Sequence, residues 1–245
     1  VEGAESNGFK ATAAQIEKAI TPKTKALILN SPSNPTGAVY SKDELMAIAD
    51  LAVEKGIYVI SDEIYDKIIY DVDLFSRISF YGEKIKDLLI IVNGVSKTYS
   101  MTGWRIGYLA APPDIARAIS NVQSHSTSNP TSFVQKAALE AIKGDQSCVS
   151  NMVVEFKKRR DYMMERIGGM KNISCVTPGG AFYAFPNIAK TGKTSSEIAS
   201  ELLEKVHVAV VPGVAFGADA NIRLSFATSM ENIKKGLDRI EEYLK

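Results

Sequence analysis

The sequence predicts an α/β fold in two parts: a mainly parallel sheet with helices between its strands, and then a smaller α+β domain. In the first half, short apolar runs alternate with helical segments, as in the strand–helix–strand units that build parallel sheets. After a long helical segment at 147–168, the apolar runs are shorter and mix with helices. We therefore expect residues 1–146 to form the sheet domain, and residues 147–245 to form the connecting helix and the smaller domain.

The elements of the sheet domain follow from apolar runs and from helix start and stop signals. Ser41 and Glu44 have the spacing of a capping box, which opens a helix that stops at Gly56. The strands are nearly continuous in apolar character, as in sheets covered by helices on both faces. In chain order we expect a helix at 12–20, a strand at 25–30, a helix at 42–54, strands at 57–61, 88–92 and 104–110, and a helical stretch at 113–143.

The smaller domain is expected to mix short strands with two helices. The strands are expected at 174–176, 182–185, 208–211 and 222–226, and the helices at 195–205 and 230–243. The basic run Lys157-Lys158-Arg159-Arg160 falls on the long helix before this domain. We interpret it as a solvated helix face rather than a nucleic-acid patch.

Composition excludes several classes of function. The 245 residues are 45% hydrophobic and 23% charged, with a formal net charge of +1, which gives no case for nucleic-acid or membrane binding. No apolar run has membrane-spanning length, and no signal peptide is evident. Cys148 and Cys175 lack metal-ligand and redox-motif spacing, so we expect no metal site and a reducing, cytoplasmic location. The start at Val1 in a polar segment suggests a fragment or a processed product.

The segment from Val95 to Gly107 carries the strongest chemical signal. It places Lys97 and Arg105 eight residues apart around a turn rich in small and hydroxyl residues, between two expected strands. A lysine amine that is desolvated or placed near a second cation can form Schiff bases with carbonyl compounds. On the residues alone, an ordinary solvated loop lysine is the favoured interpretation, because lysine side chains are mostly exposed. Arg105 stands in an expected apolar strand, where an unpaired charge is costly, and this favours a ligand role.

Three further polar residues stand at expected strand ends or within strands. Asp62 follows an expected parallel strand, where ligands of open α/β sheets bind, although taken by itself a turn or capping aspartate is the favoured interpretation. Asn34 lies in a Ser-Asn-Pro-Thr-Gly turn one strand–helix–strand step earlier, so both tips should share a sheet edge. Arg223 lies in an alternating strand and could simply face solvent.

Four segments in order resemble the fold-type I pyridoxal phosphate enzymes, and most closely the class I/II aminotransferases, in particular those of bacteria that act on aspartate. The segments are Asn30-Ser31-Pro32-Ser33-Asn34-Pro35-Thr36-Gly37, Ser61-Asp62-Glu63-Ile64-Tyr65, Val95 to Gly107 and Arg223-Leu224-Ser225-Phe226-Ala227. The resemblance covers essentially the whole chain and corresponds to the C-terminal portion of such an enzyme. It implies the later part of a large domain of the PLP-transferase type, followed by the small C-terminal domain.

The resemblance also implies cofactor roles. Lys97 would be the catalytic lysine that forms the Schiff base with pyridoxal 5'-phosphate and then moves a proton during the reaction. Asp62 would pair with the pyridine nitrogen, and Tyr65 would donate a hydrogen bond to the phenolic oxygen of the cofactor. Ser96 and Arg105 would hold its phosphate, for which a hydroxyl and a guanidinium are suitable donors.

Substrate roles are implied for two residues. Asn34 would contact the phenolic oxygen of the cofactor and lie near the substrate carboxylate, and Arg223 would bind that carboxylate with two hydrogen bonds. Some aspartate enzymes carry an arginine at the position of Ser124, but another aspartate-using subgroup does not. We therefore expect transamination of aspartate with 2-oxoglutarate by a homodimer. A carbon–sulfur lyase with the same cofactor and an inactive fragment or assembly module are the alternatives.

Overall fold

A computed structural model of the chain describes residues 1–70 and 77–245. The helices are α1 (Ala13–Ala19), α2 (Lys42–Lys55), α3 (Pro113–Ser126), α4 (Ser132–Lys143), α5 (Ser147–Gly168), α6 (Ser195–Val206) and α7 (Met230–Leu244). The strands are β1 (Ala26–Asn30), β2 (Tyr58–Asp62), β3 (Leu89–Gly94), β4 (Gly107–Ala110), β5 (Tyr183–Ala184), β6 (Val211–Pro212) and β7 (Ile222–Ser225). Two of the short 3-10 helices concern the site, η5 (Thr102–Trp104) and η7 (Gly213–Phe216).

The chain forms two compact units, and each is built from two stretches of sequence. The first unit consists of residues 1–32 and 39–151, and the second unit consists of residues 33–38 and 152–245. The short stretch 33–38 therefore belongs with the C-terminal part of the chain rather than with its sequence neighbours.

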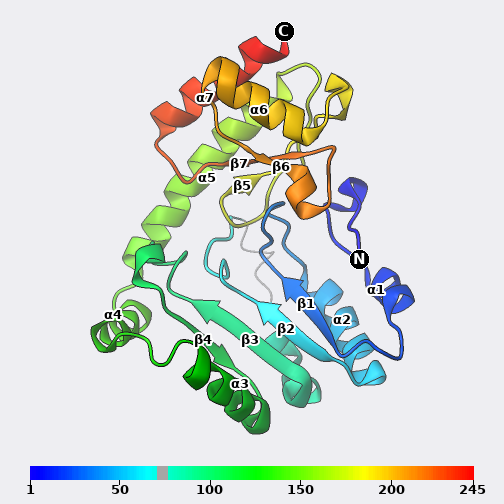
Figure 1. The fold of residues 1–245 in the computed structure, drawn as a ribbon, viewed down its shortest axis with the longest axis vertical. Helices are drawn as coiled ribbons and strands as arrows, with labels where there is room; N and C mark the ends of the chain where they lie inside the picture. Colours follow the sequence, from blue (N-terminus) through cyan, green and yellow to red (C-terminus); the bar gives the residue numbers. More distant parts are fainter. Residues whose placement is uncertain (71–76) are drawn as a thin grey trace. The chain divides into compact units, whose positions relative to one another are not determined.

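The first unit contains a four-stranded sheet in the order β1-β2-β3-β4 (Figure 1). β1, β2 and β3 are parallel, and β4 pairs antiparallel with β3. The mainly parallel α/β fold expected from the sequence is confirmed. The register pairs Asn30 with Asp62 and Asp62 with Val92, so these strands end at a common edge.

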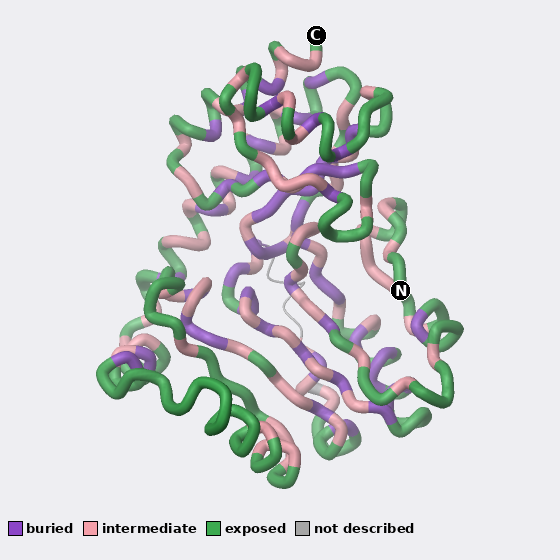
Figure 2. The backbone as a smooth tube through the Cα atoms, in the orientation of Figure 1, coloured by how far each residue is buried: buried purple, intermediate pink, exposed green. Residues whose placement is uncertain are grey.

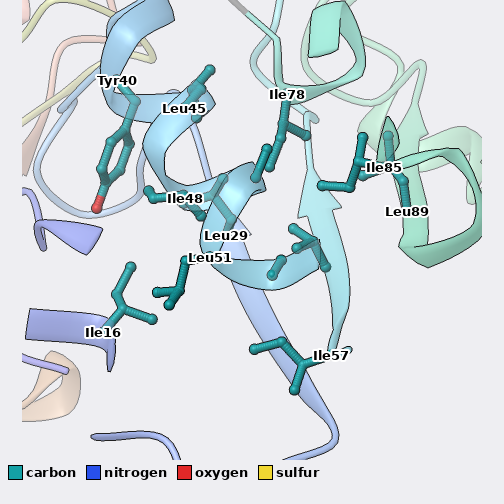
Figure 3. Packing of buried hydrophobic residues seen from close by; sticks show 13 residues of the cluster. Ile16, Leu29, Tyr40, Leu45, Ile48, Leu51, Ile57, Ile78, Ile85 and Leu89 are labelled. Carbon is teal, nitrogen blue, oxygen red and sulfur yellow. The ribbon is translucent and has the colours of Figure 1, made fainter. Parts of the chain in front are cut away.

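The core of the first unit lies between α2 and one face of this sheet (Figure 3). Ile48 of α2 is 1% exposed and Val59 of β2 is 0% exposed, so the apolar stripe of the helix meets the apolar side of the strand. On the opposite face, Ile28 of β1 is 72% exposed and Val92 of β3 is 37% exposed. The expectation of helices on both faces is therefore met on one side only along these strands. Figure 2 shows that α3 and β4 also lack buried residues.

The capping box at the start of α2 is present as expected. Ser41 Oγ accepts a hydrogen bond from Glu44 N at 3.3 Å, and Ser41 N donates to Glu44 Oε2 at 2.7 Å. Replacing Ser41 by alanine should lower the free energy of unfolding by about 1 kcal/mol, because one backbone N–H of the first turn loses its partner. Denaturant titration measures this, with the exposed neighbour change Lys42→Ala as control. Equal unfolding free energies in the two variants would contradict the capping role.

Two expected elements of the first unit are wrong in their bounds. The strand expected at 104–110 begins only at Gly107, because Thr102–Trp104 forms η5 and Arg105 has a left-handed φ of 52° that interrupts extension. The helical stretch expected at 113–143 is two helices, α3 and α4. The break contains Pro130, which disfavours helical backbone at the residue before it.

The second unit has a three-stranded antiparallel sheet in the order β5-β7-β6. Its strands are shorter than expected. The strand expected at 174–176 is reduced to one bridge between Ser174 and Asn187. The strand expected at 208–211 begins only at Val211, because His207 caps α6 in the left-handed region and Val208 N donates to Leu202 O at 2.9 Å.

The second unit also shows that the basic run on α5 is not solvated throughout. Arg160 is 4% exposed, and its Nη1 donates to Pro178 O at 3.1 Å. Asp161 pairs with the same guanidinium at 2.7 Å. The interpretation of Lys157 to Arg160 as a solvated face is therefore wrong for its last residue. In the described part of the chain, no helix has the length and apolar character needed to cross a bilayer.

Candidate active site

One edge of the first unit's sheet collects five of the residues singled out in the sequence. Asp62 is the last residue of β2, with Tyr65 in the turn beyond it. Ser96 and Lys97 lie in the turn that directly follows β3. Arg105 stands two residues before β4, whose first residue pairs with the last residue of β3. Parallel β2 and β3 end at this edge, and antiparallel β4 starts there, so strand topology explains why the residues converge.

Asp62 stabilises the turn that follows β2 through a hydrogen bond, and its side chain remains partly exposed. Its Oδ1 accepts from Ile64 N at 3.2 Å, and its backbone oxygen accepts from Asn30 Nδ2 at 3.2 Å. The turn-aspartate interpretation is therefore correct as far as it goes. It is compatible with a ligand role, because the carboxylate has a second oxygen and remains accessible.

The turn after Asp62 contains two buried acids that the sequence interpretation missed. Glu63 is 4% exposed and Asp66 is 7% exposed. Glu63 accepts from Ser61 Oγ at 3.1 Å, and Arg77 forms ion pairs with both acids. Burial raises the pKa of Glu63, and burial also raises the pKa of Asp66, although Arg77 opposes both shifts. The available signal was the segment Asp62-Glu63-Ile64-Tyr65-Asp66, which places three acids within five residues at the end of a strand.

The raised pKa of Glu63 gives a pH-dependent stability. A carboxyl whose folded pKa lies above its unfolded value stabilises the fold when protonated, and this contribution is lost as pH rises through the folded pKa. Glu63→Gln cannot ionise, so the variant should lose less unfolding free energy than the parent in the window where the pH rises above 4.5, the usual pKa of a glutamate side chain. Urea titrations at several pH values within this window test it. An identical pH slope in both proteins would contradict the assignment to Glu63.

Arg105 lies on a cavity of about 680 Å³ within the first unit. Its Nη1 donates to Thr102 O at 3.0 Å, and its side chain is exposed. Trp104 and Phe133, whose rings meet edge to face at 6.5 Å, line the same cavity. The expectation of a charge buried in an apolar strand is wrong, because Arg105 stands in an exposed left-handed turn. The guanidinium of Arg105 nevertheless lines a cavity that is large enough for a small ligand.

The other two candidate residues, Asn34 and Arg223, lie in the second unit. Arg223 Nη1 donates to Asn34 Oδ1 at 2.8 Å, although 189 positions separate the two residues in sequence. The Asn34 turn is tied to the Gly179-Gly180 turn, because Gly179 N and Gly180 N donate to Gly37 O at 2.9 Å and 3.0 Å. The seven candidates thus form two sets, five residues in the first unit and two in the second.

Aromatic contacts of Arg223 were not anticipated from the sequence. Its Cζ lies 4.5 Å from the ring centroid of Tyr183 and 5.2 Å from that of Phe216. Both distances lie within the range of cation–π attraction. The sequence signal was weak: Tyr183 ends a Gly-Gly-Ala-Phe-Tyr segment that a glycine turn also explains. Ser124 and His125 lie on α3 and are exposed. Among the described residues, no three His, Cys, Asp or Glu side chains form a metal-binding group.

Comparison with known proteins identifies the fold. The crystal structure of an aspartate aminotransferase from Rhizobium meliloti matches with a TM-score of 0.93 and 38% identity over 98% of this chain and 62% of that chain. The aromatic aminotransferase from Pyrococcus horikoshii matches with a TM-score of 0.94 and 40% identity, over 98% and 65% of the two chains. The fold is therefore that of the aminotransferases to which the sequence motifs are similar.

Sequence comparison gives the family. The family model described as aminotransferase class I and II matches residues 1–240. The aspartate aminotransferase of Geobacillus stearothermophilus is 44% identical over all of this chain and 63% of its own length. The asparagine–oxo-acid transaminase of Streptococcus mutans is also 44% identical, with the same shares covered. The chain belongs to the class I and II aminotransferases, and it spans a little under two thirds of these relatives.

Pyridoxal 5'-phosphate is the cofactor of this family, and the first unit has suitable groups for it. A phosphate ester is bound by cationic and hydroxyl donors, which Arg105 and Ser96 could supply. A protonated pyridine nitrogen is stabilised by a carboxylate, which Asp62 could supply, and an aldehyde forms a Schiff base with an amine, which Lys97 could supply. These groups belong to one sheet edge, and Arg105 among them lines the cavity.

Proposed function

We propose that the protein is a pyridoxal phosphate-dependent aminotransferase that transfers an amino group between an amino acid and a 2-oxo acid. The observation that carries this proposal is the position of Lys97, in the turn directly after β3 at the edge where β2 ends and β4 begins. Membership of the class I and II aminotransferases supports it. The chain spans only about 63% of its relatives, so the activity belongs to the whole protein.

Each residue at the sheet edge has a stated task in this proposal. Lys97 Nζ would hold the cofactor covalently as a Schiff base, and its free amine would carry a proton to and from the substrate Cα. Asp62 holds a proton on the pyridine nitrogen through charge pairing. Ser96 and Arg105 bind the phosphate, and Tyr65 Oη donates to the phenolic oxygen. The bound cofactor itself supplies the electron sink for the reaction.

The substrate carboxylate is the proposed ligand of Arg223. A guanidinium presents two parallel N–H groups to a carboxylate, and Asn34 Oδ1 already orients one terminal nitrogen. We propose aspartate and 2-oxoglutarate as the pair, supported by relatives named aspartate aminotransferase. Other relatives are named for asparagine and for N-acetyl-LL-diaminopimelate, so the choice of side chain requires a direct assay.

Two measurements test the proposal. Added pyridoxal 5'-phosphate should produce a visible absorption band, and the protein should convert aspartate and 2-oxoglutarate into oxaloacetate and glutamate. Release of ammonia and pyruvate from a sulfur amino acid, without transfer to an oxo acid, would instead identify a carbon–sulfur lyase. Absence of any band at saturating cofactor would support the inactive-module alternative for this chain.

Three further features stay predictions. The assignment of residues 1–146 to the cofactor-binding domain and residues 147–245 to the connecting helix and small domain awaits a structure with the cofactor bound. Sedimentation of the protein tests the expected homodimer. Cell fractionation tests the expected cytoplasmic location.

A further inference from the structure

The guanidinium of Arg223 is surrounded by neutral groups, an arrangement that leaves its charge available to bind an anionic ligand. It lies on β7, the central strand of its sheet, where Ile222 and Leu224 are buried and Arg223 is only partly buried. Within the described residues its guanidinium makes one hydrogen bond, to the amide of Asn34, and no ion pair with a carboxylate. Its positive charge is therefore not compensated within the second unit.

Two aromatic rings also lie against this guanidinium. Tyr183 lies on β5 directly opposite Ser225, which shares a strand face with Arg223. Phe216 ends η7, the turn after β6, and β6 borders the other side of β7. The rings lie 4.5 Å and 5.2 Å from Arg223 Cζ. A carboxylate would neutralise the positive charge. Aromatic faces attract the cation but leave its charge in place.

The ring of Phe216 is itself held by a tightly built turn. Gly213 N donates to Asn221 O at 2.8 Å, and a Cβ on Gly213 would lie 2.1 Å from Ala218 O. Val214 N donates to Ser195 Oγ at 3.1 Å, and that hydroxyl donates to Asp219 Oδ1 at 2.6 Å. Ser195 is 0% exposed. Phe216 is 36% exposed, yet the backbone that carries it has little freedom.

We propose that Tyr183 and Phe216 are positioning residues that fix the guanidinium plane of Arg223 for the α-carboxylate of the amino acid and oxo acid substrates. Asn34 fixes one terminal nitrogen, and the rings restrict rotation about the long side chain. A guanidinium that is already oriented loses less side-chain entropy when a carboxylate binds to it. This inference rests on the proposed function for its ligand, but the ordering of Arg223 can be measured without any ligand.

The test compares three variants of the protein. Phe216→Leu removes a π face, Phe216→Tyr keeps it, and Tyr243→Leu is the matched control because it removes a cation–π contact with Lys193 elsewhere in the second unit. Phe216→Leu should raise KM for the amino acid roughly threefold to thirtyfold with kcat nearly unchanged, the range expected for one cation–π contact. Phe216→Tyr should restore KM, and Tyr243→Leu should leave it at the parent value.

A second readout separates this inference from the proposed function. The Nε–H resonance of Arg223 reports side-chain order by NMR relaxation, with neither cofactor nor substrate present. Order that falls in Phe216→Leu and returns in Phe216→Tyr supports positioning, even if the parent proves to have no transaminase activity. Order unchanged in Phe216→Leu, or an equal rise of KM in Tyr243→Leu, would overturn the positioning role.

Discussion

Lys97→Ala will abolish the visible band that added pyridoxal 5'-phosphate produces, and amino transfer will fall by more than about 10⁴-fold. The reason is that, in the proposed function, one side chain performs two tasks, the covalent attachment of the cofactor and the proton transfer at the substrate Cα. No other lysine occupies the Val95–Ser100 turn after β3. Absorption spectroscopy and an assay of glutamate formation measure the two losses separately.

The control for this change is Lys86→Ala, which removes an exposed lysine of the first unit that pairs with Glu83 at its own surface. It should leave both the band and the rate at the parent values. A band that persists in Lys97→Ala would show that another amine holds the cofactor, and the central assignment would then be wrong. Loss of the rate with an intact band would assign Lys97 to proton transfer alone.

Gly37→Ala should destabilise the protein by roughly 3 kcal/mol, through backbone strain and overpacking together. Gly37 has a φ of 68°, and a Cβ there would lie 2.3 Å from Pro178 Cβ and 2.8 Å from Gly180 O. The Asn34 turn would have to move away from the Gly179-Gly180 turn. The amide that orients Arg223 would move with it, so KM for the substrate should rise as well.

Gly192→Ala is the matched control, because Gly192 belongs to the same unit and has a φ of 72°, while a Cβ added there would meet no atom within 4 Å. This variant should lower the free energy of unfolding by about 1 kcal/mol, because only the strain of the left-handed backbone is added. Denaturant unfolding compares the two. Equal losses in both variants would mean that close packing at Gly37 contributes nothing.

Local sequence patterns predicted the features that depend on local chemistry. The capping box of Ser41 and the stop at Gly56 occur as expected, because helix ends are set by a few adjacent hydrogen bonds. The parallel order of the first strands follows from strand–helix–strand alternation. The motif residues from Asp62 to Arg105 gather at one edge because parallel strands share their carboxyl ends.

Other features depend on contacts between residues that are distant in sequence, and local sequence patterns do not reveal such contacts. The sequence predicts that Arg160 is a surface residue, but in the structure its guanidinium donates a hydrogen bond to Pro178 O. Tyr183 and Phe216 reach Arg223 only through the pairing of three short strands. Arg105 adopts a left-handed conformation inside an apolar run, where periodicity predicts extension. Likewise, the exposed Ile28 shows that an apolar pattern does not tell which segment covers it.

The assignment of residues 33–38 to the second unit limits how the protein can be dissected. A gene truncated before residue 147 would encode α5 and everything after it, but it would omit the peptide whose Gly37 oxygen accepts from Gly179 N and Gly180 N. Two backbone donors of that turn would then need water in place of a carbonyl. An isolated second unit that keeps these hydrogen bonds would therefore need the 33–38 peptide, joined to it by a linker or added in trans, and a single cut would not provide it.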